Sequence, residues 1–535
     1  MSAIVLLGDE AVAQGALDAG ISGVYAYPGT PSTEITEYIQ KAPETRKQGL
    51  HSDWSANEKT AMEAALGMSY AGKRSMVCMK HVGLNVAADA FVNAGITGVN
   101  GGLLVVAADD PSMHSSQNEQ DSRFYGNFAM IPVLEPASQQ EAYELTRYGF
   151  ELSESAGLPV MLRLTTRLAH SRSSVKRSDP RKENNIALPG DPGQFILLPA
   201  LARKRYKKLL GAQETLIEAG EKSGWNRVEK GEDNSLGIIA CGLAYNYYRE
   251  AANLARLDHP VFKISQYPVS PGKLRDFIAG ADRILIAEEG APFLESSLTG
   301  ILEKDHKISG RLSGALPRDG ELNPRLMSEA LGIPSEAKAE ISGVVRNRPP
   351  ALCKGCGHID MYNALNQAIE PYGPGRVFSD IGCYTLGALP PYNAINTCVD
   401  MGASVTMAKG ASDAGLRPAV AVIGDSTFTH SGMTGLLDAV MENTPLTVII
   451  SDNSTTGMTG GQDSHATGRL KDICLGLGVD PGHVKIMNPL KKHHGINVQM
   501  IKDELEYEGV SVLISQRECI QTASRRRKAE KKHTE

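Results

Sequence analysis

The chain has 535 residues, of which 41% are hydrophobic and 22% are charged, a composition typical of a soluble globular protein. This length is enough for about three domains. Because 55 Lys and Arg residues stand against 61 Asp and Glu residues, the net charge of -6 gives no reason to expect nucleic acid as a partner.

The N-terminus carries one short apolar run, from Ile4 to Leu7, and Asp9 and Glu10 follow almost at once. A signal peptide or a membrane span needs a longer apolar stretch, so we expect no membrane segment and a cytoplasmic location. In that compartment the eight cysteines should be reduced or should hold metal.

Residues 1–185 alternate strand-like runs with helical segments such as Ser55 to Tyr70. This alternation predicts a doubly wound α/β domain with a parallel sheet, followed by a polar linker from Ser171 to Asn185. The predicted strands are 23–27, 75–79, 102–107 and 158–164.

Four residues of this domain are candidates for chemistry. Glu58 stands near the start of the predicted helix, where a buried carboxyl group would suit proton exchange, although the helix dipole alone also favours a glutamate there. Thr30 lies in a rigid turn with two prolines and a glycine, and His81 follows a strand end; each is equally compatible with a structural role. Arg123 closes a polar loop and is a candidate for binding a substrate carboxylate.

Residues 186–345 are predicted to form linker helices and a second α/β domain. A basic helical segment from Leu198 to Lys222 precedes it, and its parallel strands are expected at 236–241 and 283–287, with a helix at 245–257. A third α/β domain is expected over residues 346–522. The basic tail, residues 523–535, has almost no apolar side chain and is predicted to be disordered.

Four cysteines of the third domain form a candidate metal set. Cys353 and Cys356 form a Cys-x-x-Cys motif, Cys383 follows a probable strand end, and Cys519 follows the predicted strand Val510 to Ile514. A [4Fe-4S] cluster, a zinc ion and, for the first pair alone, a redox dithiol are all compatible with this pattern. The remaining four are expected to pack as small buried side chains: Cys78, Cys241, Cys398 and Cys474.

Two neighbouring strand ends carry the strongest signal. The apolar run Ala419 to Ile423 ends at Gly424-Asp425-Ser426, and the run Thr447 to Ile450 ends at Asp452-Asn453-Ser454-Thr455. A helical pattern lies between them, so the two strands should be parallel neighbours whose carboxyl ends meet at one sheet edge. The alternative is an ordinary β-α-β unit whose Asp and Asn cap turns.

An Asp425 carboxylate oxygen, an Asn453 amide oxygen and the Thr455 carbonyl oxygen would fill half of a magnesium octahedron, leaving the rest for diphosphate and water. Small residues such as Ser426 let phosphate approach a helix N-terminus. The 28-position spacing resembles the Gly-Asp-Gly to Asn signature of thiamine diphosphate enzymes. If thiamine diphosphate is bound nearby, an iron-sulfur cluster that removes single electrons is favoured over zinc for the four cysteines. Glu58 is then the candidate partner of the aminopyrimidine ring of the cofactor.

Longer motifs extend this resemblance to one family, the 2-oxoacid:ferredoxin oxidoreductases. Within it the chain is most similar to the large (alpha) subunits of indolepyruvate ferredoxin oxidoreductases, from Leu6 to Cys519. The motifs are YPGTPS, SANEKTAMEAA, KHVGLNVAADA, DDPSMHSSQNEQDSR, CKGCGH, SDIGCYTLGALPP, CVDMGAS, GDSTFTHSG and DNSTTGMTGGQ.

The resemblance implies three α/β domains of the thiamine diphosphate-enzyme type: pyrimidine-binding, transketolase C-terminal-like and diphosphate-binding. It implies oxidative decarboxylation of an aryl 2-oxoacid with coenzyme A, giving an aryl-acetyl-CoA, carbon dioxide and reduced ferredoxin. Its catalytic residues would be Glu58, Thr30 and His81, with Arg123 at the substrate. Magnesium would be held by Asp425, Asn453 and Thr455, and a [4Fe-4S] cluster by Cys353, Cys356, Cys383 and Cys519. Further cofactor contacts would come from His358, Gly382, Tyr384, Gly424, Ser426 and Gly457.

One departure concerns the C-terminus. Many relatives end in a ferredoxin-like segment with two cysteine runs, whereas no cysteine follows Cys519 here. Electrons would then pass to external ferredoxin or another acceptor, and a smaller oxidoreductase subunit would complete the enzyme. Two alternatives stay open: a non-redox thiamine diphosphate decarboxylase or carboligase, and an oxidoreductase for branched-chain or other 2-oxoacids.

Overall fold

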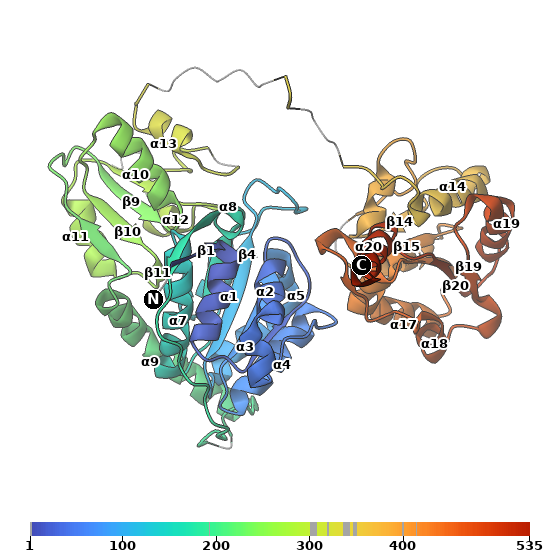
Figure 1. The fold of residues 1–535 in the computed structure, drawn as a ribbon, viewed down its shortest axis with the longest axis horizontal. Helices are drawn as coiled ribbons and strands as arrows, with labels where there is room; N and C mark the ends of the chain where they lie inside the picture. Colours follow the sequence, from blue (N-terminus) through green and yellow to red (C-terminus); the bar gives the residue numbers. More distant parts are fainter. Residues whose placement is uncertain are drawn as a thin grey trace. The chain divides into compact units, whose positions relative to one another are not determined.

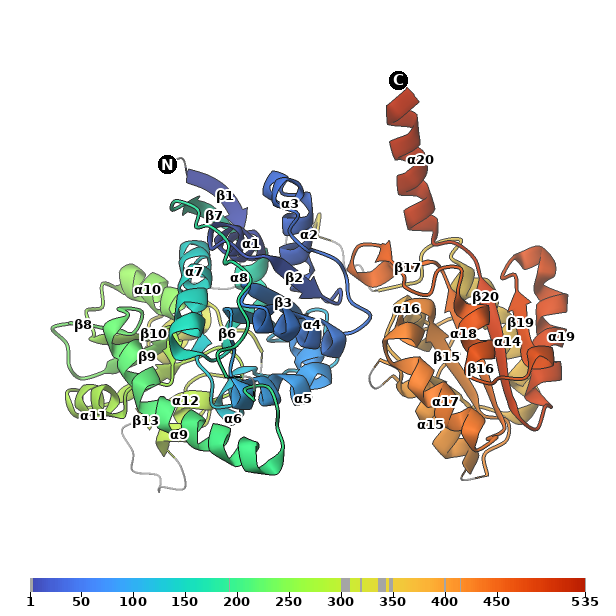
Figure 2. The ribbon, with the colours of Figure 1, turned by 90° about the horizontal axis from the view of Figure 1, so that it is seen from below.

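The computed structural model of the protein describes residues 3–191, 193–299, 308–317, 320–334, 343–345, 350–398, 401–413 and 415–534. The chain divides into two compact units, residues 1–339 and 340–535, each of which is α/β in character (Figures 1 and 2). Among the described helices none combines the length and apolar character that a membrane crossing requires.

The first unit contains a six-stranded sheet with the order β11-β5-β6-β4-β3-β2. All neighbours are parallel except β11, which pairs antiparallel with β5 at one edge. The central strands are mostly apolar and buried on both faces, as a sheet covered by helices requires. The strands are β2 (Gly23–Ala26), β3 (Ser75–Lys80), β4 (Leu103–Asp109), β5 (Val133–Leu134), β6 (Val160–Thr165) and β11 (Gln266–Tyr267).

The helices of this part of the unit follow the strands and connect them, which confirms the doubly wound pattern (Figure 1). The predicted helix over 55–70 begins at Glu58, because Asn57 caps its first turn by accepting a hydrogen bond from the Thr60 amide. The helices are α1 (Gly8–Asp18), α2 (Thr33–Lys41), α3 (Pro43–Gln48), α4 (Glu58–Tyr70), α5 (His81–Thr97), α6 (Arg123–Phe128), α7 (Gln139–Ala156) and α8 (Thr166–His170).

The polar segment predicted as a linker contains a strand. Residues Arg172–Lys176 form β7, which pairs antiparallel with β1 (Ala3–Leu7). Only Val175 of this strand is buried, so its sequence carries almost none of the apolar alternation by which strands are recognised. The pairing covers β1, which would otherwise be an unpaired edge.

A second, five-stranded sheet completes the first unit, with the order β13-β12-β9-β10-β8 and an antiparallel edge strand, β8. The two largest hydrophobic cores of the unit each contain residues from both sheets, which explains why residues 1–339 form one compact body. The elements are α9 (Pro199–Lys222), β8 (Arg227–Glu229), β9 (Gly237–Cys241), α10 (Ala244–Ala255), β10 (Val261–Ile264), α11 (Pro271–Ala279), β12 (Ile284–Ala287), α12 (Phe293–Thr299), β13 (Ile308–Ser309) and α13 (Pro324–Ala330).

The second unit has one five-stranded parallel sheet with the order β14-β15-β16-β20-β19. Helices flank it on both faces (Figure 2). The strands are β14 (Val377–Ser379), β15 (Val420–Gly424), β16 (Leu446–Asp452), β19 (Val484–Met487) and β20 (Val510–Gln516), with a small hairpin of β17 (Thr455–Thr456) and β18 (Gln462–Asp463). The helices are α14 (Gly357–Ile369), α15 (Ala403–Asp413), α16 (Asp425–Thr427), the π-helical turn η3 (Phe428–Gly432), α17 (Met433–Met441), α18 (Leu470–Gly476) and α19 (His494–Leu505).

The basic tail differs from the prediction, since residues Ile520–Thr534 form helix α20. Alanine, arginine, lysine and glutamate dominate residues 523–531, and all four are good helix formers. The three α/β sheets confirm the predicted fold class. The three-domain division itself stays a prediction: the two compact units do not test it, and residues 346–349 at the proposed boundary lie outside the described residues.

Candidate active site

The two predicted strand ends of the second unit are neighbours. Strands β15 and β16 are parallel and in register, with Gly424 opposite Ser451, so Asp425 and Asn453 follow adjacent strand ends. Asp425 is 2% exposed, and its Oδ2 atom is buried without a hydrogen-bond partner among the described residues. Burial, together with the negative charge of Asp452, raises the pKa of Asp425 to about 7. A cation bound there would compensate this carboxylate, so its environment fits a magnesium ligand.

The loop after β16 is held in a defined shape. The Asn453 side-chain oxygen accepts a hydrogen bond from the Thr455 amide at 3.1 Å, and Ser454 between them has a φ of 59°. Since an amide oxygen has two lone pairs, one acceptor site of Asn453 is left for a metal ion. The hydroxyl groups of Ser426 and Thr456 are 2.8 Å apart and join this loop to the start of α16.

Tyr384 packs against both small residues at the strand ends. A Cβ atom added to Gly424 would lie 2.5 Å from the tyrosine ring, and one added to Gly382 would also collide with it. The ring is buried, and its hydroxyl donates a hydrogen bond to Asp380. Asp380 in turn accepts hydrogen bonds from the Gly402 and Ser404 amides, and burial raises its pKa to about 6. Our sequence reasoning did not select Asp380, although an acid directly after a strand is the same signal that selected Asp425.

The four predicted cluster cysteines line one cavity of about 200 Å³. The Cys353 carbonyl accepts a hydrogen bond from the Cys356 amide at 2.9 Å, which closes the Cys-x-x-Cys turn. The Cys519 amide donates to the Asn453 carbonyl at 3.0 Å, so the cysteine cavity and the candidate magnesium site share one loop. A Cβ atom added to Gly457 would lie 3.0 Å from the Cys383 sulfur, which shows how closely that thiol approaches the backbone.

The thiols are close enough to influence one another. Burial raises the pKa of Cys383 to about 12, and the neighbouring thiols Cys356 and Cys519 add to the shift. A set of thiolates this close would repel one another unless a metal group neutralised them. His358 is buried with its Nδ1 atom 3.3 Å from the Cys356 sulfur, and burial lowers its pKa to about 4, so its imidazole is neutral at pH 7.

Several polar residues around the cavity were not selected from the sequence. Gln521 lies with its side-chain nitrogen 3.6 Å from the Cys353 sulfur, and Arg517 and Arg525 also line the cavity. Arg517 directly follows β20, and Gln521 and Arg525 lie in the first part of α20. The sequence of this segment has no recognisable motif apart from Cys519. Cys78, Cys241 and Cys474 are buried as predicted, whereas Cys398 is exposed and that prediction was wrong. Its neighbours Val399 and Asp400, in the CVDMGAS motif, lie outside the described residues.

In the first unit, Glu58 lies in a tightly packed position. Residues His51 and Trp54 bridge to β2 in the parallel sense, so the chain enters α4 at the carboxyl edge of the sheet. Glu58 is buried, and a Cβ atom added to Gly83 in the first turn of α5 would lie 2.6 Å from its Oε1 atom. Its carboxyl group therefore occupies space that only a glycine leaves open.

Thr30 and His81 lie at the same edge. His81 begins α5 directly after Lys80, and its Nε2 atom is 3.2 Å from the Asn118 side-chain oxygen while its buried Nδ1 atom has no hydrogen-bond partner among the described residues. The turn that carries Thr30 packs against Lys80, because a Cβ atom added to Gly29 would be 3.2 Å from the Lys80 Cβ. The three predicted catalytic residues of this unit thus follow neighbouring parallel strands.

Arg123 does not match its predicted role in binding a substrate carboxylate. Its guanidinium group is fully buried and pairs with Asp121 and with Glu288, the latter at 2.9 Å. It also donates to the backbone carbonyls of Glu289 and Ala291 at 3.1 and 3.0 Å. Because these donors already have partners within the unit, Arg123 connects the two sheets, and we withdraw the substrate role.

Two segments match known families of proteins. Residues 14–195 match the family described as "Pyruvate flavodoxin/ferredoxin oxidoreductase, thiamine diP-bdg". Residues 380–506 match "Thiamine pyrophosphate enzyme, C-terminal TPP binding domain". The two segments contain Glu58 and Asp425 respectively, which are the candidate residues that sequence reasoning placed in the two halves of a thiamine site.

Several curated proteins are similar to nearly the whole chain. The indolepyruvate oxidoreductase subunit IorA of Archaeoglobus fulgidus is 39% identical over 561 residues, covering 99% of this chain and 88% of that protein. The subunits of the same name from Methanothermobacter thermautotrophicus and Pyrococcus horikoshii are each 38% identical; the alignments cover 97% and 96% of this chain, and 87% and 85% of the relatives. Among solved structures, the 2-oxoglutarate:ferredoxin oxidoreductase from Magnetococcus marinus aligns with a TM-score of 0.51 and 20% identity. This alignment covers 62% of this chain and 65% of that chain and supports the fold alone.

Proposed function

The chain belongs to the indolepyruvate oxidoreductase subunit IorA family of 2-oxoacid:ferredoxin oxidoreductases, and on this premise we propose that it is the large subunit of an enzyme that oxidatively decarboxylates an aryl 2-oxoacid such as indolepyruvate. Coenzyme A accepts the acyl group, carbon dioxide leaves, and two electrons pass to ferredoxin or a similar acceptor. The aryl substrate follows the name of the relatives, and their designation as a subunit supports a smaller partner subunit.

The proposed cofactor is thiamine diphosphate with magnesium. Asp425, Asn453 and the Thr455 carbonyl would hold the metal ion, and the observation that supports this assignment is the Asp425 oxygen, which has no hydrogen-bond partner in the part of the chain that the structure describes. Ser426, a small residue in the first turn of α16, would let a phosphate group approach the backbone there. When bound, the cofactor supplies the nucleophilic carbon and the electron sink for decarboxylation. Glu58 is the carboxyl group that we assign to proton exchange with the aminopyrimidine ring, and Thr30 and His81 are proposed to position substrate.

The redox part of the proposal depends on one observation: Cys353, Cys356, Cys383 and Cys519 line a single cavity. A zinc ion with bonds of about 2.3 Å would hold its sulfur ligands within roughly 4 Å of one another. Among the residues that the structure describes, no three of these sulfur atoms lie within 4.8 Å of one another. The wider spacing favours a [4Fe-4S] cluster, which spreads its four thiolates over a larger group. A non-redox decarboxylase would have no use for such a cavity.

Anaerobic purification with the partner subunit tests this proposal. We expect about four iron and four sulfide ions per large subunit in the wild type, loss of most of both in Cys383→Ser, and full retention in Cys398→Ser, whose exposed thiol lies outside the cavity. With coenzyme A and a viologen dye, arylpyruvates should be oxidised fastest in a panel of 2-oxoacids. Decarboxylation without dye reduction, in a protein free of iron, would establish the non-redox alternative instead.

A further inference from the structure

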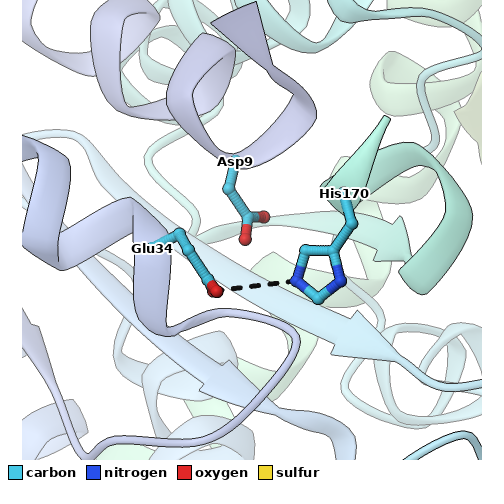
Figure 3. Close-up of side chains that lie close together, drawn as sticks. All are labelled: Asp9, Glu34 and His170. Carbon is cyan, nitrogen blue, oxygen red and sulfur yellow. Dashed lines mark ion pairs between the residues drawn. The ribbon is translucent and has the colours of Figure 1, made fainter. Parts of the chain in front are cut away.

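A second cluster of potential ligands lies in the first unit, among residues to which the proposed reaction gives no role. It consists of Asp9 in the first turn of α1, Glu34 in the first turn of α2 and His170 at the end of α8 (Figure 3). One ligand atom from each residue lies within 4.8 Å of the other two. The Glu34 Oε2 atom and the His170 Nε2 atom are 3.7 Å apart. Within the described part of the chain no other three His, Cys, Asp or Glu side chains meet this condition.

Asp9 is the residue that requires explanation. It is 0% exposed, and both of its carboxylate oxygens are buried without a hydrogen-bond partner among the described residues. Figure 3 shows its carboxylate directed at the space between Glu34 and His170. A buried carboxylate without compensation is strongly unfavourable, so the folded protein must supply either a proton or a cation at this position.

The backbone around Asp9 does not supply the missing partner. The two amides that precede it are already used, since the Leu7 amide donates to the Glu10 carboxylate at 2.8 Å and the Gly8 amide donates to the Ser171 carbonyl at 3.2 Å. The hydrogen bond between Gly8 and Ser171 also holds His170 near the start of α1, because Ser171 directly follows His170 in the chain. A Cβ atom at Gly8 would collide with the Leu168 carbonyl, so α8 lies directly on the start of α1. This close approach brings the imidazole to the buried carboxylate.

We propose that Asp9, Glu34 and His170 bind a divalent transition-metal ion of the zinc type. Two carboxylate oxygens and one imidazole nitrogen form the kind of three-residue ligand set that zinc accepts, with a fourth position left for water. Calcium and magnesium prefer ligand sets made of oxygen alone, and calcium needs six or more. Bonds of about 2.0–2.2 Å to a tetrahedral ion place ligand atoms roughly 3.5 Å apart, and the observed 3.7 Å between Glu34 and His170 agrees with this spacing.

The site is open on one side. The side chains of Glu34 and His170 are 39% and 37% exposed, although the Glu34 Oε2 atom itself is buried, so an ion would reach the site past two partly exposed side chains without crossing the core. Both residues follow carboxyl ends of strands, because α2 comes after β2 and α8 comes directly after β6. The turn that contains Thr30 leads into α2, and Thr30 lies four residues before Glu34. A bound ion therefore ties three segments together beside the edge that carries the proposed catalytic residues, and it is distinct from the magnesium proposed in the second unit.

Zinc itself is the probe for the test. The full chain, purified anaerobically with its cluster and then treated with a chelator, is dialysed against zinc, and bound metal is counted per chain. We expect Asp9→Asn and His170→Gln each to bind one zinc ion fewer than the wild type. The matched control is His114→Gln, which removes another partly exposed histidine; it lies 3.4 Å from Glu321 and has no third ligand of this kind among the residues that the structure describes. This control should bind as much zinc as the wild type.

A second readout reports on the first unit alone. Both tryptophans of the chain, Trp54 and Trp225, lie in residues 1–339, so the thermal transition in tryptophan fluorescence follows that unit. Zinc should raise its midpoint in the wild type and in His114→Gln and should leave it unchanged in the two site variants. His170→Gln changes a partly exposed side chain and decides the question if Asp9→Asn does not fold. Equal zinc counts in His170→Gln and the wild type overturn the proposal, and Asp9 then holds a proton instead.

Discussion

The interpretation of Arg123 as a connection between two sheets leads to a specific prediction for Arg123→Met. Methionine approximates the aliphatic volume of the side chain but offers no charge and no donor. The substitution would leave Asp121 and Glu288 buried near one another with their main cation removed. Breaking a buried ion pair in this way costs about 3–5 kcal/mol of unfolding free energy. The loss should be in that range for the first unit.

The matched control is Arg167→Met. Arg167 also pairs with a glutamate, Glu321, but its side chain is 43% exposed, so solvent can replace the lost interaction. The expected change is below about 1 kcal/mol, as for other exposed ion pairs. Urea unfolding followed by tryptophan fluorescence measures both variants, since Trp54 and Trp225 report on residues 1–339.

Enzyme kinetics separate the two interpretations of Arg123. If the residue only connects the sheets, the folded fraction of Arg123→Met should have the KM of the wild type for the 2-oxoacid. A variant that unfolds at the wild-type urea concentration but has a KM raised tenfold or more would refute our reasoning. In that case the sequence-based role, binding of a substrate carboxylate, would be restored.

Three further predictions follow from the packing and the pKa values. Gly83→Ala places a methyl group 2.6 Å from the Glu58 carboxyl oxygen and should lower kcat by roughly 10²-fold. Glu58→Gln should lower kcat to the same extent, and a double variant much slower than either single variant would show that the two substitutions act separately. Asp425→Ala should abolish the magnesium-dependent binding of thiamine diphosphate, measured by calorimetry. Asp438→Ala removes an exposed carboxylate and should leave that binding unchanged. Unchanged binding in Asp425→Ala would exclude the proposed metal site. Burial raises the pKa of Glu289 from 4.5 to about 7, so its stabilising contribution is complete below pH 4.5 and is lost as pH rises through 7. Glu289→Gln should remove about 2.5 kcal/mol of the pH dependence of first-unit stability between pH 5 and 8, and identical pH profiles would contradict that shift.

Local sequence patterns were sufficient for the longest buried strands of both units. Mostly apolar runs such as those in Leu103–Asp109 and Leu446–Asp452 are typical of a parallel strand that is covered on both faces, so they mark these strands without knowledge of the fold. The residues that follow such runs, among them Asp425 and Asn453, must then meet at one sheet edge. The polar strand Arg172–Lys176 was missed for the converse reason: only one of its side chains is buried, so pairing with β1 and not apolar character makes it a strand.

The sequence by itself therefore determined the α/β class, the family and the residues at the carboxyl ends of the strands, because those features depend on short-range order along the chain. Only the tertiary structure decided how distant residues combine. Cys353 and Cys519 are far apart in the chain yet line one cavity, and Arg123 pairs with the distant Glu288. Asp9, Glu34 and His170 belong to no motif and come together because α8 packs directly against the start of α1. Contacts between segments so far apart depend on how the layers pack, and no local pattern in the sequence specifies that packing.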